Sequence, residues 1–201
     1  SRFMEVLVSW GEKPISGWEL KSILAEISEK LGAACAEISL KFRYFYPAIA
    51  PVTSSQSLLD YKCEFWGRLD HGRFHYQLGV EIPVVSLCPC SKTIAQYGAH
   101  NQRAIIKAWL KFSAKEHLWI EEVIEILEKQ GSCQIYPLLK REDEKAVTEM
   151  AYDNPKFVED ILRDSVLALK SEKKIKGFRL EVESLESIHN HSAFARHEEN
   201  Y

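Results

Sequence analysis

The residues with the clearest chemical potential lie within the segment 84–103. Cys88 and Cys90 close an apolar run that is typical of a strand, and His100 follows after a short polar connection. Pro89, between the two cysteines, cannot donate a backbone hydrogen bond, so we expect the strand to end there. A thiolate and an imidazole are ligands that a borderline-soft divalent metal prefers. Two or three protein ligands would leave a position for water, which is typical of a catalytic metal site.

The Cys-x-Cys spacing alone leaves three interpretations open. Cys88 and Cys90 could be two small core residues, a redox pair or metal ligands. A redox pair more often has the Cys-x-x-Cys spacing, and the nearby His100 favours a metal. The count of five cysteines is odd, which argues against a disulfide framework and predicts a reducing, cytoplasmic location. The other three, in or beside strand-like segments, are predicted to be buried, inert thiols: Cys35, Cys63 and Cys133.

Two later segments contain carboxylates that could complete a site. The acid-rich stretch 141–149 is typical of a solvated loop, but it could deliver one carboxylate to a metal. Its candidates, which composition cannot separate, are Glu142, Glu144 and Glu149. Glu159 lies beside the apolar stripe of a predicted helix. It is either a surface residue or a carboxylate that accepts hydrogen bonds from a base or amide ligand.

Two histidines follow the last predicted strand. His189 and His191 are two residues apart, so they project to the same face of an extended chain. Either could act as an acid or base, because imidazole titrates near pH 7. Surface histidines that do no chemistry are the alternative. The remaining four have no carboxylate or cysteine pattern around them and are interpreted as structural: His71, His75, His117 and His197.

The composition limits the class of protein. A chain of 201 residues forms one domain or two small ones, and 46% hydrophobic with 27% charged residues is ordinary for a globular protein. The net charge of −3 shows no basic excess, so no nucleic-acid partner is expected. No apolar run approaches the roughly 20 residues that span a bilayer, so no membrane partner is expected either. The first ten residues lack the pattern of a signal peptide.

The first half is predicted to form one helix and three strands. The helix covers 15–32, because Ser16 and Glu19 form a capping box and Gly32 is suited to its end. Three segments then alternate with a period of two, which indicates half-buried antiparallel strands. They are 34–46, 59–69 and 74–82, with a loop at 47–56 and a hairpin turn at 70–72.

The second half mixes helices and strands in a similar way. Asn154 is predicted to cap a helix that has Pro155 at its first position. The other expected elements are a helical turn at 91–97, a strand at 104–112, a helix at 116–130, a short strand at 134–140 and a last strand at 178–182. The fold class is therefore α+β with antiparallel sheet and helices packed on one face.

The blocks 86–92 and 97–103 resemble, almost residue for residue, the signature of the GTP cyclohydrolase type IB family. Their sequences are Ser-Leu-Cys-Pro-Cys-Ser-Lys and Tyr-Gly-Ala-His-Asn-Gln-Arg. Further matching blocks follow in the family's order, so the resemblance covers nearly the whole chain. They are 57–61, 119–122, 139–141, 143–145, 147–149, 154–160 and 186–189.

This resemblance implies a tunnelling fold, in which antiparallel sheets backed by helices assemble into barrels across subunits. It implies a homo-oligomer, typically a tetramer, with active sites at subunit interfaces. The implied reaction converts GTP and water to 7,8-dihydroneopterin triphosphate and formate, the first step of folate or pterin biosynthesis. One divalent metal is implied, zinc or manganese, with iron in archaeal relatives. Two modules are expected, 1–83 and 84–201, and the second contains most site residues.

The resemblance also implies roles for individual residues. Cys88, His100 and Glu144 match metal ligands, with Cys90 as the alternative thiolate. Glu159 matches the carboxylate that anchors guanine, and His189 matches a histidine placed for proton transfer. The catalytic set is thus Cys88, His189 and Glu159. Substrate binding beyond Glu159 is assigned to His191 and to the cations nearest the site, which are Lys92, Arg103, Lys140 and Arg141.

The chain departs from the family pattern in two places. A pair of strands usually precedes the position of Ser1, so the first module is expected to lack them here. Glu142 stands where many relatives have proline, and it adds a rival carboxylate beside Glu144. Two alternatives to a GTP cyclohydrolase remain at this point. One is another tunnelling-fold enzyme, such as a deazaguanine nitrile reductase with a nucleophilic cysteine and NADPH, and the other is a non-catalytic metal-binding relative.

Overall fold

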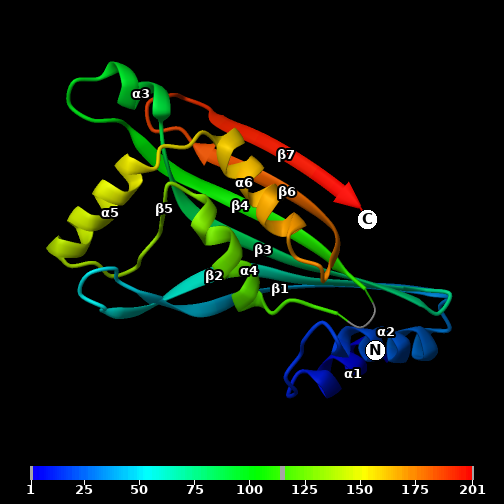
Figure 1. Cartoon of the computed structure of the whole chain (residues 1–201). Helices are drawn as coiled ribbons and strands as arrows, with labels where there is room; N and C mark the ends of the chain where they lie inside the picture. The colour runs from blue at the N-terminus through cyan, green and yellow to red at the C-terminus, as the bar shows by residue number, and fades with distance from the viewer. Residues whose placement is uncertain (1, 114–115, 201) are drawn as a thin grey trace.

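A single antiparallel sheet forms the centre of the computed structural model, which describes residues 2–113 and 116–200 (Figure 1). The strands follow the order β1-β2-β3-β4-β6-β7, and the short β5 pairs with β3 off this path. This arrangement confirms the predicted class. The strands are β1 (Cys35–Ile49), β2 (Gln56–Asp70), β3 (Arg73–Leu87), β4 (Asn101–Phe112), β5 (Cys133–Gln134), β6 (Ile175–Leu185) and β7 (Ser192–Asn200).

The three predicted strands of the first half form two long hairpins. β1 pairs with β2 from Cys35 opposite Asp70 to Ile49 opposite Gln56. The β2–β3 turn is the predicted one, and both of its central residues have positive φ, 47° at His71 and 80° at Gly72. Such a turn matches the twist of the flanking strands. Each strand has 15 residues, longer than alternation alone indicated.

The helices that build the core lie on one face of the sheet. Figure 1 shows α4 and α6 lying across it, and residues of α2, α4 and α6 share one buried cluster with β3 and β4. The opposite face of the sheet alternates with this core and is more polar. The helices are α1 (Arg2–Trp10), α2 (Glu19–Leu31), α3 (Pro89–Ile94), α4 (Ile120–Leu127), α5 (Arg141–Asp153) and α6 (Val158–Lys170), with a 3-10 turn η1 (Glu128–Gln130).

The prediction of a loop at 141–149 is wrong, because this stretch begins the helix α5. The Asp143 carboxylate accepts a hydrogen bond from the Lys140 N–H at 3.0 Å, which satisfies a free donor at the helix start. Val147 and Ala151 then pack against Leu87 of β3. Few apolar residues of α5 face the sheet, so the sequence shows only a weak helical periodicity of apolar residues.

Other boundaries differ from expectation as well. The helix predicted at 116–130 begins only at Ile120 and ends in η1, and the helical turn predicted at 91–97 is α3, at 89–94. The predicted strand at 134–140 is reduced to the two residues of β5. Asn154 ends α5 instead of capping the next helix, which begins at Val158. The capping pair of α2 forms as predicted, with the Ser16 N–H donating to Glu19 at 2.8 Å, but the helix starts only at Glu19.

Two elements were absent from the prediction, the helix α1 and the edge strand β7. On the inward face of β7 the only apolar residues are the small Ala193 and Ala195, so the alternation of apolar residues is weak. The expected module boundary at residues 83–84 lies inside β3, and the hydrogen-bonded sheet continues across it. The division into two modules stays a prediction. None of the helices in the described part of the chain is long and apolar enough to cross a membrane.

Candidate active site

Cys88 lies at the point where β3 gives way to α3. Its backbone is extended, with φ −68° and ψ 117°, and it occupies the N-cap position of α3. Its Sγ accepts a hydrogen bond from the Ser91 N–H at 3.4 Å. Pro89 stands at the first helical position, where its missing N–H costs nothing. The predicted end of the strand at Pro89 is therefore confirmed, and the thiol is placed at the end of the sheet.

His100 is brought beside Cys88 by two backbone contacts. The Cys88 N–H donates to the His100 carbonyl at 3.1 Å, and the His100 N–H donates to Ser91 Oγ at 3.2 Å. These bonds close the α3 loop onto the start of β4. The thiol and the imidazole thus lie on adjacent segments at one end of the sheet, the two donor types that a metal such as zinc takes.

The His100 ring is oriented by a small polar cluster. Its Nδ1 lies 2.9 Å from Gln102 Oε1 and 3.3 Å from Ser187 Oγ. Gln102 in turn donates from Nε2 to Glu186 Oε1 at 3.2 Å. Since Gln102 Oε1 can only accept, it assigns the proton to Nδ1 and leaves Nε2 as the nitrogen that can bind a metal. The sequence analysis missed Gln102, Ser187 and Glu186, although all three lie in blocks that match the family.

The predicted third ligand is not brought to this pair. Glu144 is exposed on α5, and the rival residues Glu142 and Glu149 are exposed on the same helix. Across residues 2–113 and 116–200, no three His, Cys, Asp or Glu side chains come together in a way that could hold a metal ion. The chain by itself therefore offers a pair of fitting donors, Cys88 and His100. Cys90 is exposed on α3.

Asp143, between the candidate carboxylates, is a residue that the sequence analysis missed. It is fully buried and accepts hydrogen bonds from Val52 N–H and Thr53 N–H, both at 2.9 Å, and from Thr53 Oγ1 at 2.7 Å. Burial alone would raise the pKa of Asp143, but these bonds and the one from the Lys140 N–H lower it well below its usual range. The carboxylate thus holds the β1–β2 connection against the start of α5.

The predicted cations do not form one group. Lys92 donates from Nζ to the Tyr152 carbonyl and lies 4.2 Å above the Tyr152 ring, so it connects α3 to α5. Lys140 and Arg141 are exposed at the start of α5, at the opposite end of that helix. Arg103 is exposed on β4, on the face opposite the buried Ala104.

His189 and His191 lie in the connection between β6 and β7. Both are exposed, and their rings stack with centroids 5.2 Å apart and planes at 18°. The expectation that they project to one face is therefore confirmed. Ser187 of the same connection reaches the His100 ring, and Figure 1 shows this connection close to α3. Both histidines thus lie at the end of the sheet where Cys88 stands.

Glu159 is exposed in the first turn of α6, while its neighbours Val158 and Ile161 are buried. The backbone just before α6 is bonded to the end of β3. The Lys156 N–H donates to the Leu87 carbonyl at 3.0 Å, next to Cys88. The chain segment that presents Glu159 is thus connected directly to the strand that presents Cys88.

The other cysteines only partly follow expectation. Cys63 and Cys133 are buried, and burial raises the pKa of the Cys63 thiol to about 12, which makes it inert at neutral pH. The prediction that Cys35 is buried is wrong. It is exposed because it begins the edge strand β1.

Comparison with known proteins gives a match over nearly the whole chain. Residues 1–195 match the protein family described as type I GTP cyclohydrolase folE2. The GTP cyclohydrolase FolE2 of Citrifermentans bemidjiense is 48% identical over 195 residues, which cover 97% of this chain and 72% of that protein. The protein of the same name from Geobacter sulfurreducens is 47% identical over 200 residues, covering 100% of this chain and 76% of that one.

Solved structures with a similar fold are uricases. The uricase of Arthrobacter globiformis superimposes with a TM-score of 0.57 at 7% identity, over 99% of this chain and 74% of that one. A uricase from Bacillus fastidious gives a TM-score of 0.55 at 8% identity, over 98% and 71% of the two chains. At such low identity the likeness concerns the fold alone, and it agrees with the tunnelling fold expected from the sequence.

Proposed function

Because this chain belongs to the type I GTP cyclohydrolase FolE2 family, we propose that it hydrolyses GTP at the end of the sheet where Cys88 and His100 meet. The products are 7,8-dihydroneopterin triphosphate and formate, and the reaction is the first step of folate biosynthesis. One observation carries the location. The backbone bond from Cys88 to His100, at 3.1 Å, joins two residues whose side chains suit a divalent metal, and a second contact orients the imidazole, which supports this location.

A divalent metal is the cofactor that suits these donors, zinc or manganese in the first instance and iron as a further possibility. Cys88 and His100 would hold it, with Glu144 as the third ligand and Cys90 as the rival to Cys88. Such an ion supplies Lewis-acid activation of the water that hydrolyses C8 of guanine. The protein's own contribution begins at His100, since Gln102 and Ser187 hold Nδ1 and leave Nε2 available to bind the ion.

The remaining roles are proposed for a carboxylate, two histidines and four cations. The Glu159 carboxylate would accept hydrogen bonds from the ring N–H and amino group of guanine, which selects this base because other bases would leave the carboxylate unpaired. His189 would move protons during ring opening and reclosure, with His191 stacked on it as a substrate contact. Lys92, Arg103, Lys140 and Arg141 are proposed for the triphosphate.

A homo-oligomer, with a tetramer as the specific proposal, would complete this site. Glu144 is exposed and does not approach Cys88 within the chain, so a neighbouring copy is its natural source. The sheet supports this assembly, because β1 and β7 lie at its two edges with backbone groups that another copy can pair. A cytoplasmic location is part of the proposal, since the free cysteines suit a reducing compartment.

The test is an assay of purified protein with GTP and zinc or manganese, with and without a chelator. Oxidised product is followed by pterin fluorescence, and metal content is measured on the same samples. We expect pterin with metal and little after chelation. No pterin with any metal would leave the non-catalytic relative as the better interpretation.

Two matched variants separate the rival thiolates. Cys88→Ala is expected to lower bound metal and activity at least 100-fold, while Cys90→Ala keeps most of both. The reverse pattern would assign the ligand to Cys90. The deazaguanine nitrile reductase has little support, since the family match covers residues 1–195.

A further inference from the structure

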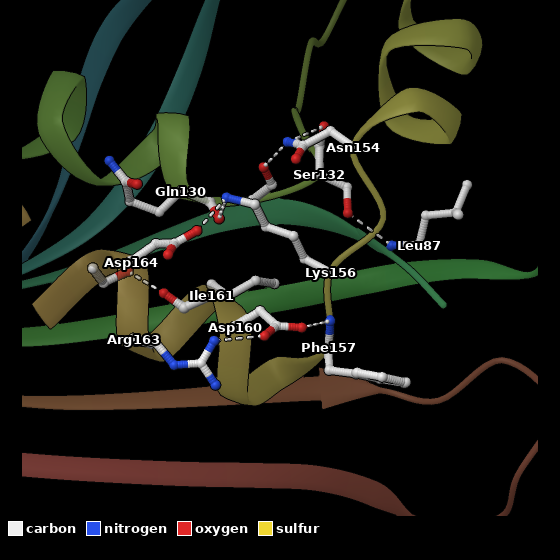
Figure 2. A network of polar contacts seen from close by, with 12 residues as sticks. Leu87, Gln130, Ser132, Asn154, Lys156, Phe157, Asp160, Ile161, Arg163 and Asp164 are labelled. Carbon is white, nitrogen blue, oxygen red and sulfur yellow. Dashed lines mark hydrogen bonds and ion pairs between the residues drawn. The ribbon is translucent and has the colours of Figure 1, made fainter. Parts of the chain in front are cut away.

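The linker between α5 and α6, residues 154–157, is hydrogen-bonded through Asn154 and Lys156 to the segment that precedes β5 (Figure 2). Asn154 donates from Nδ2 to the carbonyls of Gly131 at 3.1 Å and Ser132 at 3.3 Å. Lys156 donates from Nζ to the Gln130 carbonyl at 3.0 Å. The linker therefore has little freedom relative to residues 130–132.

The same residues are bonded to the end of β3. Ser132 N–H donates to the Val85 carbonyl at 2.7 Å, and its hydroxyl accepts from the Leu87 N–H at 3.0 Å. The Lys156 N–H donates to the Leu87 carbonyl at 3.0 Å. Leu87 immediately precedes Cys88, so both of its backbone polar groups are committed to this network.

The approach of the two segments leaves no room for a larger residue. A Cβ added at Gly131 would lie 2.5 Å from Val84 Cβ of β3, well inside contact distance. The backbone there can come close to the strand only because glycine has no side chain. The spacing between β3 and the segment that supports the linker is thereby set by contact as well as by hydrogen bonds.

The Lys156 ammonium is the point at which three elements meet. Its side chain is only 14% exposed, and Nζ lies 2.7 Å from Asp164 Oδ2 as well as 3.0 Å from the Gln130 carbonyl. Gln130 belongs to η1, and Asp164 stands in the second turn of α6. A buried lysine is a weak source of stability, since desolvation offsets much of its attraction to a carboxylate. The lysine instead connects the linker to α6, because its ion pair with Asp164 fixes the orientation of this helix relative to the linker.

We propose that Lys156 is a positioning residue, which holds the first turn of α6 so that Glu159 stands at a set distance from Cys88. It touches neither GTP nor a metal. This role rests on the proposed function, in which Cys88 and Glu159 contact opposite parts of the reaction centre. Displacing Glu159 weakens recognition of the guanine edge while the Cys88–His100 bonds remain, because those bonds lie outside the network.

The test compares GTP with inosine triphosphate, which lacks the amino group that Glu159 would bind. Lys156→Met removes the ammonium with little change in length, and a double variant with Asp164→Leu also removes the partner charge so that neither is left buried alone. Lys156→Arg keeps the charge. Arg163→Met is the control, because it removes an exposed ion pair to Asp160 on the same helix but keeps the Asp160 carboxylate, which accepts from the Phe157 N–H, and all contacts of Lys156. Each variant is measured for KM, kcat, metal content and unfolding temperature.

In Lys156→Met and in the double variant, we expect KM for GTP to rise about tenfold. The preference for GTP over inosine triphosphate is expected to fall by a similar factor, while the metal content stays unchanged. Lys156→Arg restores much of the preference, and Arg163→Met keeps it. An unchanged preference in a folded double variant, or an equal loss of kcat for both nucleotides with a lower unfolding temperature, would overturn the role and leave Lys156 purely structural. Wild-type protein without GTP turnover overturns the proposed function itself, which is a separate result.

Discussion

At the scale of single residues, the proposed metal site depends on contacts that orient a proposed ligand as much as on the ligand itself. His100 is held through Nδ1 by Gln102, which Glu186 orients in turn. An imidazole fixed in this way presents one nitrogen in one direction, which lowers the entropy lost on binding a metal. A substitution of Gln102 therefore tests the orientation of the His100 ring without removing a proposed metal ligand.

Gln102→Leu is expected to weaken metal binding by about 10-fold to 100-fold, because the ring loses its acceptor while both donors stay. The measurement is competition with a chelator of known affinity, followed by pterin formation at saturating metal. Gln56→Leu, an exposed glutamine on β2, is the matched control. Equal metal affinity in the Gln102 and Gln56 variants would show that the ring is oriented by other groups.

The sequence predicted these local features well and the distant ones poorly. Cys88 and His100 are joined through a short connection, so their proximity follows from strand, turn and strand in succession. Asp143 was missed because its partners, Val52 and Thr53, lie about 90 positions earlier and only the folded chain brings them together. Glu144 could not be placed, since the described part of one chain does not bring it to the other ligands.

At the scale of elements, the long strands were predictable from the sequence, whereas a packed helix with few apolar residues was not. β1, β2 and β3 alternate over many residues, so their pairing and the turn at Gly72 were predictable. α5 has only Val147 and Ala151 facing the sheet. Its position depends instead on polar contacts at its start, above all on Asp143.

Asp143 predicts how stability depends on pH. Its pKa is lowered in the folded state, so its contribution is present above the unfolded value, near pH 4, and is lost as pH falls through the folded value. Asp143→Asn is expected to lower the unfolding temperature at pH 7 and to flatten the loss of stability between pH 5 and about pH 3. The measurement is thermal unfolding over pH 3–7. Asp153, exposed on the same helix, is the control, and Asp153→Asn should keep the wild-type dependence of unfolding temperature on pH. Parallel curves for the wild type and Asp143→Asn would contradict a role of the Asp143 carboxylate in this dependence.

At the scale of the whole molecule, the sheet has two open edges, and the proposed metal site has two of its three proposed ligands on adjacent segments. Both features follow from the topology, because β1 and β7 end the strand order and α5 lies at the side of the sheet near β5. In Figure 1, α5 and α3 lie at the same end of the sheet, where Lys92 connects them. A neighbouring copy that pairs along an edge would bring a second α5 to a first Cys88.

A subunit-mixing experiment tests this directly. Cys88→Ala and Glu144→Ala chains, each inactive alone, are co-expressed and purified together. If Glu144 comes from a neighbour, random assembly gives roughly a quarter of the sites an intact Cys88 from one copy and an intact Glu144 from another, and activity returns to about that fraction. Mixing Cys88→Ala with His100→Ala is the control, because one chain provides both residues and no intact pair can form. Recovery in neither mixture would place all three ligands on one chain and remove the reason for an interfacial site, and recovery in the control would contradict the assignment of Cys88 and His100 to one chain.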